Sequence, residues 1–524
     1  MFFKLSSFSL VGIQAIEIFV EIHISNGLPT FTIVGLPDKA VNESRQRVRA
    51  AIINSGFKFP PKKITINLSP ADIKKEGVFY DLPIAIAILI ASEQVKNVNF
   101  TLIEKSSFIG ELSLDGKINS IRGIICMAEQ CRNSKKEYFF IPKDNLRQAS
   151  CIKGINLISS TNLIEVINII TNKSIENIFI DNFKDIGEDA SFDLDNLDIS
   201  FKTLNIDFSD IKGQSKAKRA IEIAASGMHN ILLVGPPGAG KTMLAQRIIT
   251  IMPELNLEES IEVTKIYSLY KKYKDIFIKI RPFRNPHHTV SRASLIGGGI
   301  VPKPGEISLA HRGVLFLDEF SQFPKYLIED LRQPLENKEI IISRNNLFYK
   351  FPCNFMLVLA TNPCACGYFQ DSAKKCKCST KEIENYWKNI SGPIMDRIDM
   401  RINVPRLDYQ DFFKKLPSEN SQDIKARINE AHKIQKIRYK NIKNLNINFN
   451  SEADSKLVNQ WVEKNSEIKK TVLEVFNTYK LSGRAMASLL KVSRTIADLD
   501  MSTNIKTKHF MEALNYRVNF NSEI

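Results

Sequence analysis

Residues 235–242 read GPPGAGKT, and this pattern could hold the phosphates of a nucleotide. It follows the apolar run 231–234 and precedes a helical pattern, which is the setting that a phosphate-binding loop requires. Glycines let backbone N–H groups point at the phosphates at the start of a helix. The Lys241 amine then supplies charge for the β- and γ-phosphates, and the Thr242 hydroxyl can ligate Mg²⁺. The predicted nucleotide-binding residues are Gly235, Pro236, Pro237, Gly238, Ala239, Gly240, Lys241 and Thr242.

Two acidic residues, Asp318 and Glu319, follow a second apolar run at 313–317. Carboxylates at the end of a buried strand suit ATP hydrolysis, with Asp318 holding Mg²⁺ and Glu319 polarising the attacking water. A third apolar run, 355–360, leads into Thr-Asn-Pro. The Asn362 amide could orient the same water, although Asn-Pro is also a good turn.

Four cysteines stand in two closely spaced pairs with nine residues between the pairs. Four thiolates can hold a tetrahedral Zn²⁺, but the C-x-C spacing is tighter than the usual C-x₂-C. The alternative is a reduced, solvent-exposed loop. The predicted zinc ligands are Cys364, Cys366, Cys376 and Cys378, while Cys126, Cys131, Cys151 and Cys353 read as small core residues.

Composition indicates a soluble protein with a polyanionic partner. The chain is 44% hydrophobic and 25% charged, with a formal net charge of +15. Such a charge favours nucleic acid, although an abundance of lysine throughout the chain could have the same effect. No apolar run is long enough to span a bilayer, and the first residues lack a signal-peptide pattern. We expect a cytoplasmic protein that does not bind membranes.

The elements that must position these residues fall into four segments. Alternating apolar residues at 8–35 predict strands, and helices are expected at 42–54 and 81–92, giving an α+β domain over residues 1–172. An acidic linker is expected at 173–205, because 181–200 holds seven acidic residues and one lysine. The nucleotide core then spans 206–406, including the cysteine insert 364–378, and a helical domain spans 407–524.

Longer motifs add a resemblance to a known family. GPPGAGKT, GVLFLDEF (313–320) and ATNP (360–363) look like the Walker motifs and sensor 1 of an AAA+ ATPase. The chain also resembles the YifB/ComM family of magnesium-chelatase-like ATPases over nearly its whole length. The motifs that carry this resemblance are RNPHHTVSRASLIGGG (284–299), PGEISLAHRG (304–313), NPCACG (362–367), SGPIMDRIDM (391–400) and LSGRAMASLLKVSRTIADLD (481–500).

The resemblance implies an α/β multidomain fold and a hexameric ring with ATP sites between subunits. It implies an AAA+ P-loop core followed by a C-terminal helical lid. Arg397 matches the arginine finger, which stabilises charge on the γ-phosphate of a neighbouring subunit. Arg484 matches sensor 2 on the lid. Without the family, either side chain would read as an ordinary surface or ion-paired arginine.

Two segments match loops that project into the pore of such rings. One is the glycine-rich stretch 287–306, and the other is a strand pair expected within 336–355, turning at 344–346. An insert of this kind could also serve only subunit packing, and paired histidines could in principle bind a metal. The candidates for contacts to the DNA backbone are His287, His288, Arg292, Lys303 and Arg344.

The N-terminal segment resembles the proteolytic domain of Lon, a fold like that of ribosomal protein S5 domain 2. IGELSLDGKINSIRGI (109–124) and KKEGVFYDLPIAIAIL (74–89) carry the resemblance. Val78, Phe79 and Tyr80 stand where Lon has its serine, and the expected lysine after Gly123 is missing. Without this dyad we expect no protease activity.

These observations favour a DNA-dependent AAA+ ATPase that uses ATP and Mg²⁺, with Zn²⁺ as a further possible ion. The family resemblance implies a helicase or branch-migration motor that acts in natural transformation and recombination. The alternative is a chelatase-like ATPase that remodels a protein partner without moving along DNA. ATP-dependent proteolysis is a third candidate, which the missing dyad opposes.

Overall fold

The chain forms two compact units, and each is described by itself. The first unit holds residues 1–172 together with parts of 257–278 and 343–351, and the second holds the rest. The acidic stretch 181–200 lies outside the described residues. The computed structural model describes residues 1–172, 206–270, 277–344, 347–371, 373–388, 392–407, 419–440, 442, 447–463 and 466–517.

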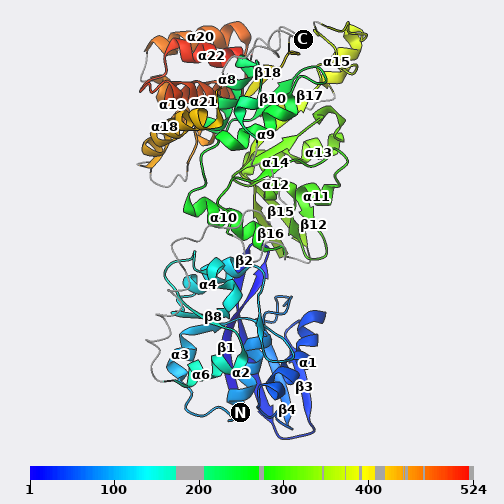
Figure 1. Cartoon of the computed structure of the whole chain (residues 1–524), viewed down its shortest axis with the longest axis vertical. Helices are drawn as coiled ribbons and strands as arrows, with labels where there is room; N and C mark the ends of the chain where they lie inside the picture. Colours follow the sequence, from blue (N-terminus) through cyan, green and yellow to red (C-terminus); the bar gives the residue numbers. More distant parts are fainter. Residues whose placement is uncertain are drawn as a thin grey trace. The chain divides into compact units, whose positions relative to one another are not determined.

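The first unit is built on a seven-stranded mixed sheet (Figure 1). Its two longest strands pair as an antiparallel hairpin from Phe2 opposite His23 to Val11 opposite Gln14. The strands expected from the alternation at 8–35 are confirmed, and burial alternates along much of β2, whereas residues 5–9 of β1 are all buried. In sheet order the strands are β3 (Thr30–Val34), β4 (Lys63–Ser69), β2 (Gln14–Ser25), β1 (Phe2–Val11), β5 (Ser106–Phe108), β8 (Tyr138–Pro142) and β9 (Asn156–Ser160).

Helices pack on this sheet, and their sequences explain their positions. Asp38 caps the first helix by accepting a hydrogen bond from the Val41 backbone N–H at 2.7 Å. Every residue of the second helix is buried, as its continuous apolar sequence indicates. The helices are α1 (Lys39–Asn54), α2 (Asp81–Ala91), α3 (Phe100–Glu104), α4 (Ile124–Asn133), α5 (Leu146–Ala149) and α6 (Leu163–Thr171). Strand β5 is followed by a short β6 (Glu111–Leu112), which pairs with β7 (Ile118–Asn119).

A helix from the middle of the chain completes the first unit. Helix α10 (Leu257–Ser268) packs against α4, where Lys265 Nζ lies 2.6 Å from Glu129 Oε2. The Gly123 backbone N–H also donates to the Ser268 carbonyl at 3.1 Å. In the sequence this helix lies between the phosphate loop and the acidic pair, far from α4.

The second unit contains a five-stranded parallel sheet in the order β11-β14-β17-β10-β18. Three central strands arise from the three apolar runs of the sequence, because a parallel sheet is covered on both faces. The strands are β11 (Phe283–Arg284), β14 (Val314–Leu317), β17 (Met356–Thr361), β10 (Ile231–Val234) and β18 (Met400–Asn403). The sheet and its helices therefore form an α/β layer structure, as expected.

The C-terminal helices share one hydrophobic core with α8, β10, β17 and β18. Helix α21 packs against both α8 and α18, as Figure 1 shows at the end of the molecule coloured orange and red. Met486, Leu489 and Ile496 of α21 are buried in this core. The helices are α8 (Ser215–Gly227), α9 (Lys241–Ile251), α18 (Ser421–Lys440), α19 (Ser455–Glu463), α20 (Ser466–Tyr479), α21 (Gly483–Leu499) and α22 (Thr507–Asn515).

Smaller elements connect the strands of the parallel sheet. Two glycines form β12 (Gly297–Gly298), which pairs with β13 (Lys303–Pro304). A second pair, β15 (Glu339–Arg344) and β16 (Leu347–Pro352), lies within the segment where a strand pair was expected, and its turn residues 345 and 346 are outside the described part. The short helices are α11 (Arg292–Ile296), α12 (Glu306–Leu309), α13 (Lys325–Asp330), α14 (Arg332–Asn337), α15 (Thr380–Lys388) and α16 (Gly392–Met395). In the ranges described above, no helix combines the length and apolarity needed to cross a bilayer.

Candidate functional site

The phosphate-binding pattern forms a loop between β10 and α9, as the sequence predicts. Its backbone requires glycine at several positions. A Cβ on Gly235 would lie 2.1 Å from the Val404 carbonyl oxygen, and Gly238 and Gly240 have φ angles of +79° and +89°. These left-handed angles favour glycine and turn the chain directly into the first turn of α9. The loop thus presents a helix N-terminus at the carboxyl edge of the sheet, where open α/β sheets bind ligands.

Lys241 lies inside this loop. Its Nζ donates to the carbonyl oxygens of Gly235 at 2.6 Å and Pro236 at 3.0 Å, and to Oδ1 of Asn362 at 3.1 Å. Burial lowers the pKa of Lys241 to about 8, against the opposing influence of Asp318 and Glu319. The amine therefore lies between the phosphate loop and the end of β17, where a phosphate group could replace its carbonyl contacts.

The acidic pair lies opposite the start of α9. Oγ1 of Thr242 donates to Oδ2 of Asp318 at 2.7 Å, and the Glu319 backbone N–H donates to Oδ1 of the same carboxylate at 2.9 Å. A hydroxyl and a carboxylate in contact are the oxygen ligands that Mg²⁺ uses beside a nucleotide. Glu319 adopts a left-handed φ of +48°, an uncommon conformation that functional sites often retain.

The two histidines expected to contact DNA have different surroundings. The His287 and His288 rings pack with centroids 4.0 Å apart. Nδ1 of His288 lies 3.8 Å from Oε2 of Glu319, so this side chain contacts the predicted catalytic base. Among the other candidates, Arg292 forms a two-point ion pair with Asp330 at 2.7 and 2.8 Å, while Lys303 and Arg344 are exposed.

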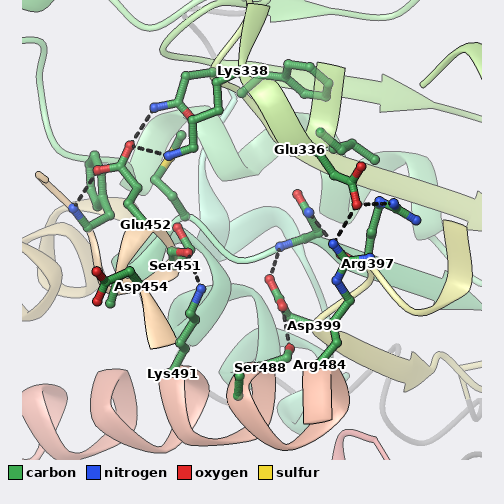
Figure 2. A pocket seen from close by; sticks show the side chains of 18 of the residues that line it. Glu336, Lys338, Arg397, Asp399, Ser451, Glu452, Asp454, Arg484, Ser488 and Lys491 are labelled. Atoms are coloured by element: carbon green, nitrogen blue, oxygen red, sulfur yellow. Dashed lines mark hydrogen bonds and ion pairs between the residues drawn. The ribbon is translucent and has the colours of Figure 1, made fainter. Parts of the chain in front are cut away.

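Arg397 and Arg484 lie close together in the second unit, at a site separate from the phosphate loop. Both guanidinium groups bind Oε1 of Glu336 at the end of α14, and Arg484 does so at 2.6 Å (Figure 2). Hydrogen bonds from Arg484 and then Arg397 lower the pKa of Glu336. The sequence shows no sign of this shared acceptor, because Glu336 is 61 and 148 residues from its two partners.

The arginines line a cavity of about 750 Å³ at the amino ends of the parallel strands. Its wall includes Asn230, which precedes β10, and Asp399, which precedes β18. Oδ2 of Asp399 accepts from the Asn230 N–H at 3.0 Å, and Figure 2 shows Ser488 of α21 bonded to the same carboxylate. The phosphate loop follows the carboxyl end of β10, so the length of this four-residue strand, about 13 Å, separates the ends at which the two sites lie. The structure does not bring Arg397 or Arg484 to the phosphate loop of the same chain.

The four paired cysteines converge. Their Sγ atoms all lie within 4.8 Å of one another, and Cys364 lies 3.4 Å from Cys366 and 3.7 Å from Cys376. Backbone N–H groups of Lys377 and Tyr368 lower the pKa of Cys366 to about 6. Such a group of thiols could hold a metal ion. Of the other cysteines, Cys126, Cys131 and Cys353 are buried as expected, whereas Cys151 is half-buried and packs against the core that contains Cys126 and Cys131.

The side chains that hold the backbone around Asn362 in place were not predicted from the sequence. The Tyr386 hydroxyl, on α15, lies 2.8 Å from Oγ1 of Thr361, 3.0 Å from the Asn362 carbonyl and 2.8 Å from Oγ of Ser321. Nε1 of Trp387 donates to the Pro363 carbonyl at 3.1 Å. The only sequence signal is an adjacent Tyr-Trp pair on a short amphipathic helix, which gives no partner.

Comparisons with protein-family models match three successive parts of the chain. Residues 207–412 match the magnesium chelatase subunit ChlI model, and residues 20–145 match a second model described as subunit ChlI of Mg-chelatase. Residues 418–517 match the C-terminal model of the same subunit. The first match contains the phosphate loop, the acidic pair and the cysteine cluster.

Individual relatives extend over almost the whole chain. The competence protein ComM of Haemophilus influenzae is 39% identical over 510 residues, which cover 97% of this chain and 96% of the relative. The protein YifB of Escherichia coli is also 39% identical, over 515 residues that cover 97% and 95% of the two chains. The magnesium-chelatase 67 kDa subunit of Chlorobaculum parvum is 25% identical over 160 residues, covering 30% of this chain and 23% of that protein. With its AAA+-like nucleotide core and these full-length matches, the chain belongs to the ComM/YifB family of magnesium-chelatase-like proteins.

Proposed function

We propose that this chain is an ATP-dependent motor that acts on DNA as a closed ring of identical subunits, a hexamer by family resemblance. One observation supports the assembly of the chain into a ring. The phosphate loop with Lys241, Asp318 and Glu319 lies at one edge of the parallel sheet, and Arg397 and Arg484 line a cavity at the opposite edge. If both arginines act on ATP, the nucleotide must belong to a neighbouring copy. Head-to-tail contacts of this kind close into rings.

Within one such site, each group has a distinct role. Backbone N–H groups of the loop and Lys241 bind the phosphates, Thr242 and Asp318 hold Mg²⁺, and Glu319 takes the proton of the attacking water. Asn362 orients that water. Arg397 from the adjacent subunit stabilises the charge that spreads over the phosphoryl oxygens, and Arg484 binds the same phosphates. Glu336 holds the two arginines together until the neighbour's phosphates compete for them.

DNA is the substrate that the charge of the chain favours. A formal net charge of +15 attracts a polyanion, and the exposed Lys303 on β13 adjoins a glycine-rich turn that could follow a phosphate backbone. The relative from Haemophilus influenzae is named a competence protein, which supports a role in natural transformation as a helicase or branch-migration factor. The first unit serves in this proposal as a Lon-like scaffold without protease activity. Its Phe79 and Tyr80 are buried core side chains rather than a displayed nucleophile.

The test is ATP hydrolysis by the purified chain with single-stranded, duplex and forked DNA at one fixed salt concentration, because phosphate contacts depend strongly on salt. We expect several-fold stimulation by at least one DNA, and no turnover in Glu319→Gln. Glu329→Gln is the matched control, because Glu329 is a surface carboxylate paired with Arg332. An ATP hydrolysis rate that is the same with and without each DNA would contradict the proposed DNA motor. It would favour the alternative, a chelatase-like ATPase that remodels a protein partner.

A further inference from the structure

We propose that Cys364, Cys366, Cys376 and Cys378 bind one Zn²⁺, and that this ion holds the segment after β17 against the ATP site. The assignment of the metal depends only on the four cysteines, whereas the expected effect of the metal on ATP turnover rests on the proposed ATPase function.

The spacing of the four sulfur atoms fits a tetrahedral zinc ion. Zn–S bonds of about 2.3 Å place thiolates about 3.8 Å apart at the corners of a tetrahedron. The measured Sγ–Sγ distances of 3.4, 3.7 and 3.6 Å among Cys364, Cys366 and Cys376 lie near this value. They are far longer than a disulfide bond of about 2.05 Å, and all four thiols are free.

Backbone N–H groups point at the sulfur atoms of the cluster. The Cys378 backbone N–H points at Sγ of Cys376 at 3.4 Å, and further backbone N–H groups point at Cys364 and Cys366. Hydrogen bonds of this kind orient metal ligands and disperse their charge. Cys364 is buried and the other three are half-buried, so the cluster closes on itself rather than leaving a position open for a substrate. A closed four-sulfur site is structural rather than catalytic.

The metal would connect two contacts beside the ATP site. At the start of the segment, Asn362 accepts the hydrogen bond of Lys241, and a Cβ on Gly367 would lie 3.0 Å from Cδ of Pro237 in the phosphate loop. At its end, the Tyr386 hydroxyl binds Ser321, two residues beyond Glu319. A zinc ion that cross-links the residues between these two contacts would restrict the motion at both of them. Asn362 would therefore stay beside the phosphates.

The experiment compares the full-length chain with a Cys376→Ser/Cys378→Ser variant, and Cys151→Ser serves as the thiol control because Cys151 lies outside the cluster. Zinc and iron are measured by elemental analysis. Trypsin cleavage after Lys374, Lys375 and Lys377, mapped by mass spectrometry, reports whether the loop opens, because proteases cut locally unfolded backbone. ATP-analogue affinity and hydrolysis without DNA are measured on the same samples.

We expect one zinc per chain in the wild type and in Cys151→Ser, and none in the double variant. The double variant should be cut in the loop and should hydrolyse ATP about tenfold to a hundredfold more slowly, since small misplacements of an orienting group have costs of this size. Cys378→His, which keeps a zinc ligand, should restore both protection and turnover. If the double variant does not fold, removing zinc from the wild type with a chelator and adding it back gives the same comparison.

Each failure identifies the part that is wrong. A metal-free wild type, iron in place of zinc, or a loop that chelation leaves protected would overturn the zinc site. Zinc loss that opens the loop but leaves turnover unchanged would overturn its coupling to ATP. A wild type that binds zinc, protects its loop and never hydrolyses ATP would instead count against the proposed ATPase function.

Discussion

Nδ1 of His288 lies 3.8 Å from Oε2 of Glu319, so the predicted catalytic base has a neighbour from the glycine-rich stretch 287–306. His288 follows β11, and Glu319 follows the adjacent strand β14. If this stretch contacts DNA, the His288–Glu319 pair connects the DNA-binding segment directly with the predicted catalytic base. The pair therefore offers one physical means by which DNA could change the rate of hydrolysis.

Replacing His288 by alanine should raise ATP hydrolysis without DNA and reduce the further stimulation by DNA. An exposed pair of this kind contributes up to about 1 kcal/mol, which corresponds to a rate change of up to about fivefold. Steady-state ATPase assays with and without DNA measure both quantities. His23→Ala is the control, because His23 is an exposed histidine on β2 of the first unit and belongs to no predicted site. Equal stimulation ratios in His288→Ala and the wild type would refute the coupling.

Mixing two inactive variants tests whether Arg397 acts on a neighbouring subunit. Arg397→Ala keeps the phosphate loop, and Lys241→Ala keeps the arginine. Random assembly of equal amounts places an intact loop beside an intact arginine at about a quarter of the interfaces. We expect ATP turnover to reappear in the mixture and to be absent when either partner is replaced by the Lys241→Ala/Arg397→Ala double variant. No recovery at any ratio would mean that the arginine does not complete a neighbour's site.

Nucleotide binding should take up protons near pH 8. The pKa of Lys241 is lowered to about 8 by burial, and phosphate groups would raise it again by stabilising the charged amine. At pH 8 about half a proton should therefore bind with each ATP analogue. Titration calorimetry in two buffers of different ionisation enthalpy measures this uptake, and affinity should weaken as the pH rises above 8.

The control for this measurement is Lys241→Arg, whose side chain stays charged and should show no uptake. The same shift affects stability. Because the pKa of Lys241 is lower in the folded chain than in the unfolded chain, its contribution to folding improves as the pH rises from about 8 to about 10.5. Uptake that is identical in the wild type and Lys241→Arg would assign the proton to another group.

Asp498 stabilises the C-terminal helices through a buried ion-pair network. Its carboxylate accepts from Arg438 at 2.8 Å, from Arg494 at 2.9 Å and from Asn450 at 2.8 Å. Asp498→Ala would leave two mostly buried arginines without this acceptor, at an expected cost of about 3–5 kcal/mol in the free energy of unfolding. Denaturant melts followed by circular dichroism measure the loss. Glu430→Ala, which removes the surface pair with Lys433, should cost less than about 1 kcal/mol.

The parts of the site that are contiguous in sequence are the parts that could be predicted. Apolar runs predicted β10, β14 and β17, and the polar residues that follow these runs meet at one edge because neighbouring parallel strands end there. Glu336, Tyr386 and the contact of His288 with Glu319 could not be predicted. Each depends on which helix or loop faces which, and local periodicity carries no information about that.

Domain organisation could be predicted only in outline for a similar reason. Residues 257–268 lie between two motifs of the nucleotide core in the sequence, and only the packing of α10 on α4 assigns this helix to the first unit. The resemblance predicted functional roles for Arg397 and Arg484, but it did not indicate that they share one carboxylate acceptor. That relationship appears only when α14, α16 and α21 are folded around the same cavity.

The position of α10 in the first unit also determines which fragments of this chain can contain a complete unit. The chain passes between the units after residue 172 and again at 256–257, 278–279, 342–343 and 351–352. A fragment that begins at residue 206 would therefore carry Ile261 and Phe277, which pack in the core of the first unit, without the α4 residues of that core. Truncation at a single point cannot yield either unit intact, and exchange of a unit between relatives requires several segments to be inherited together.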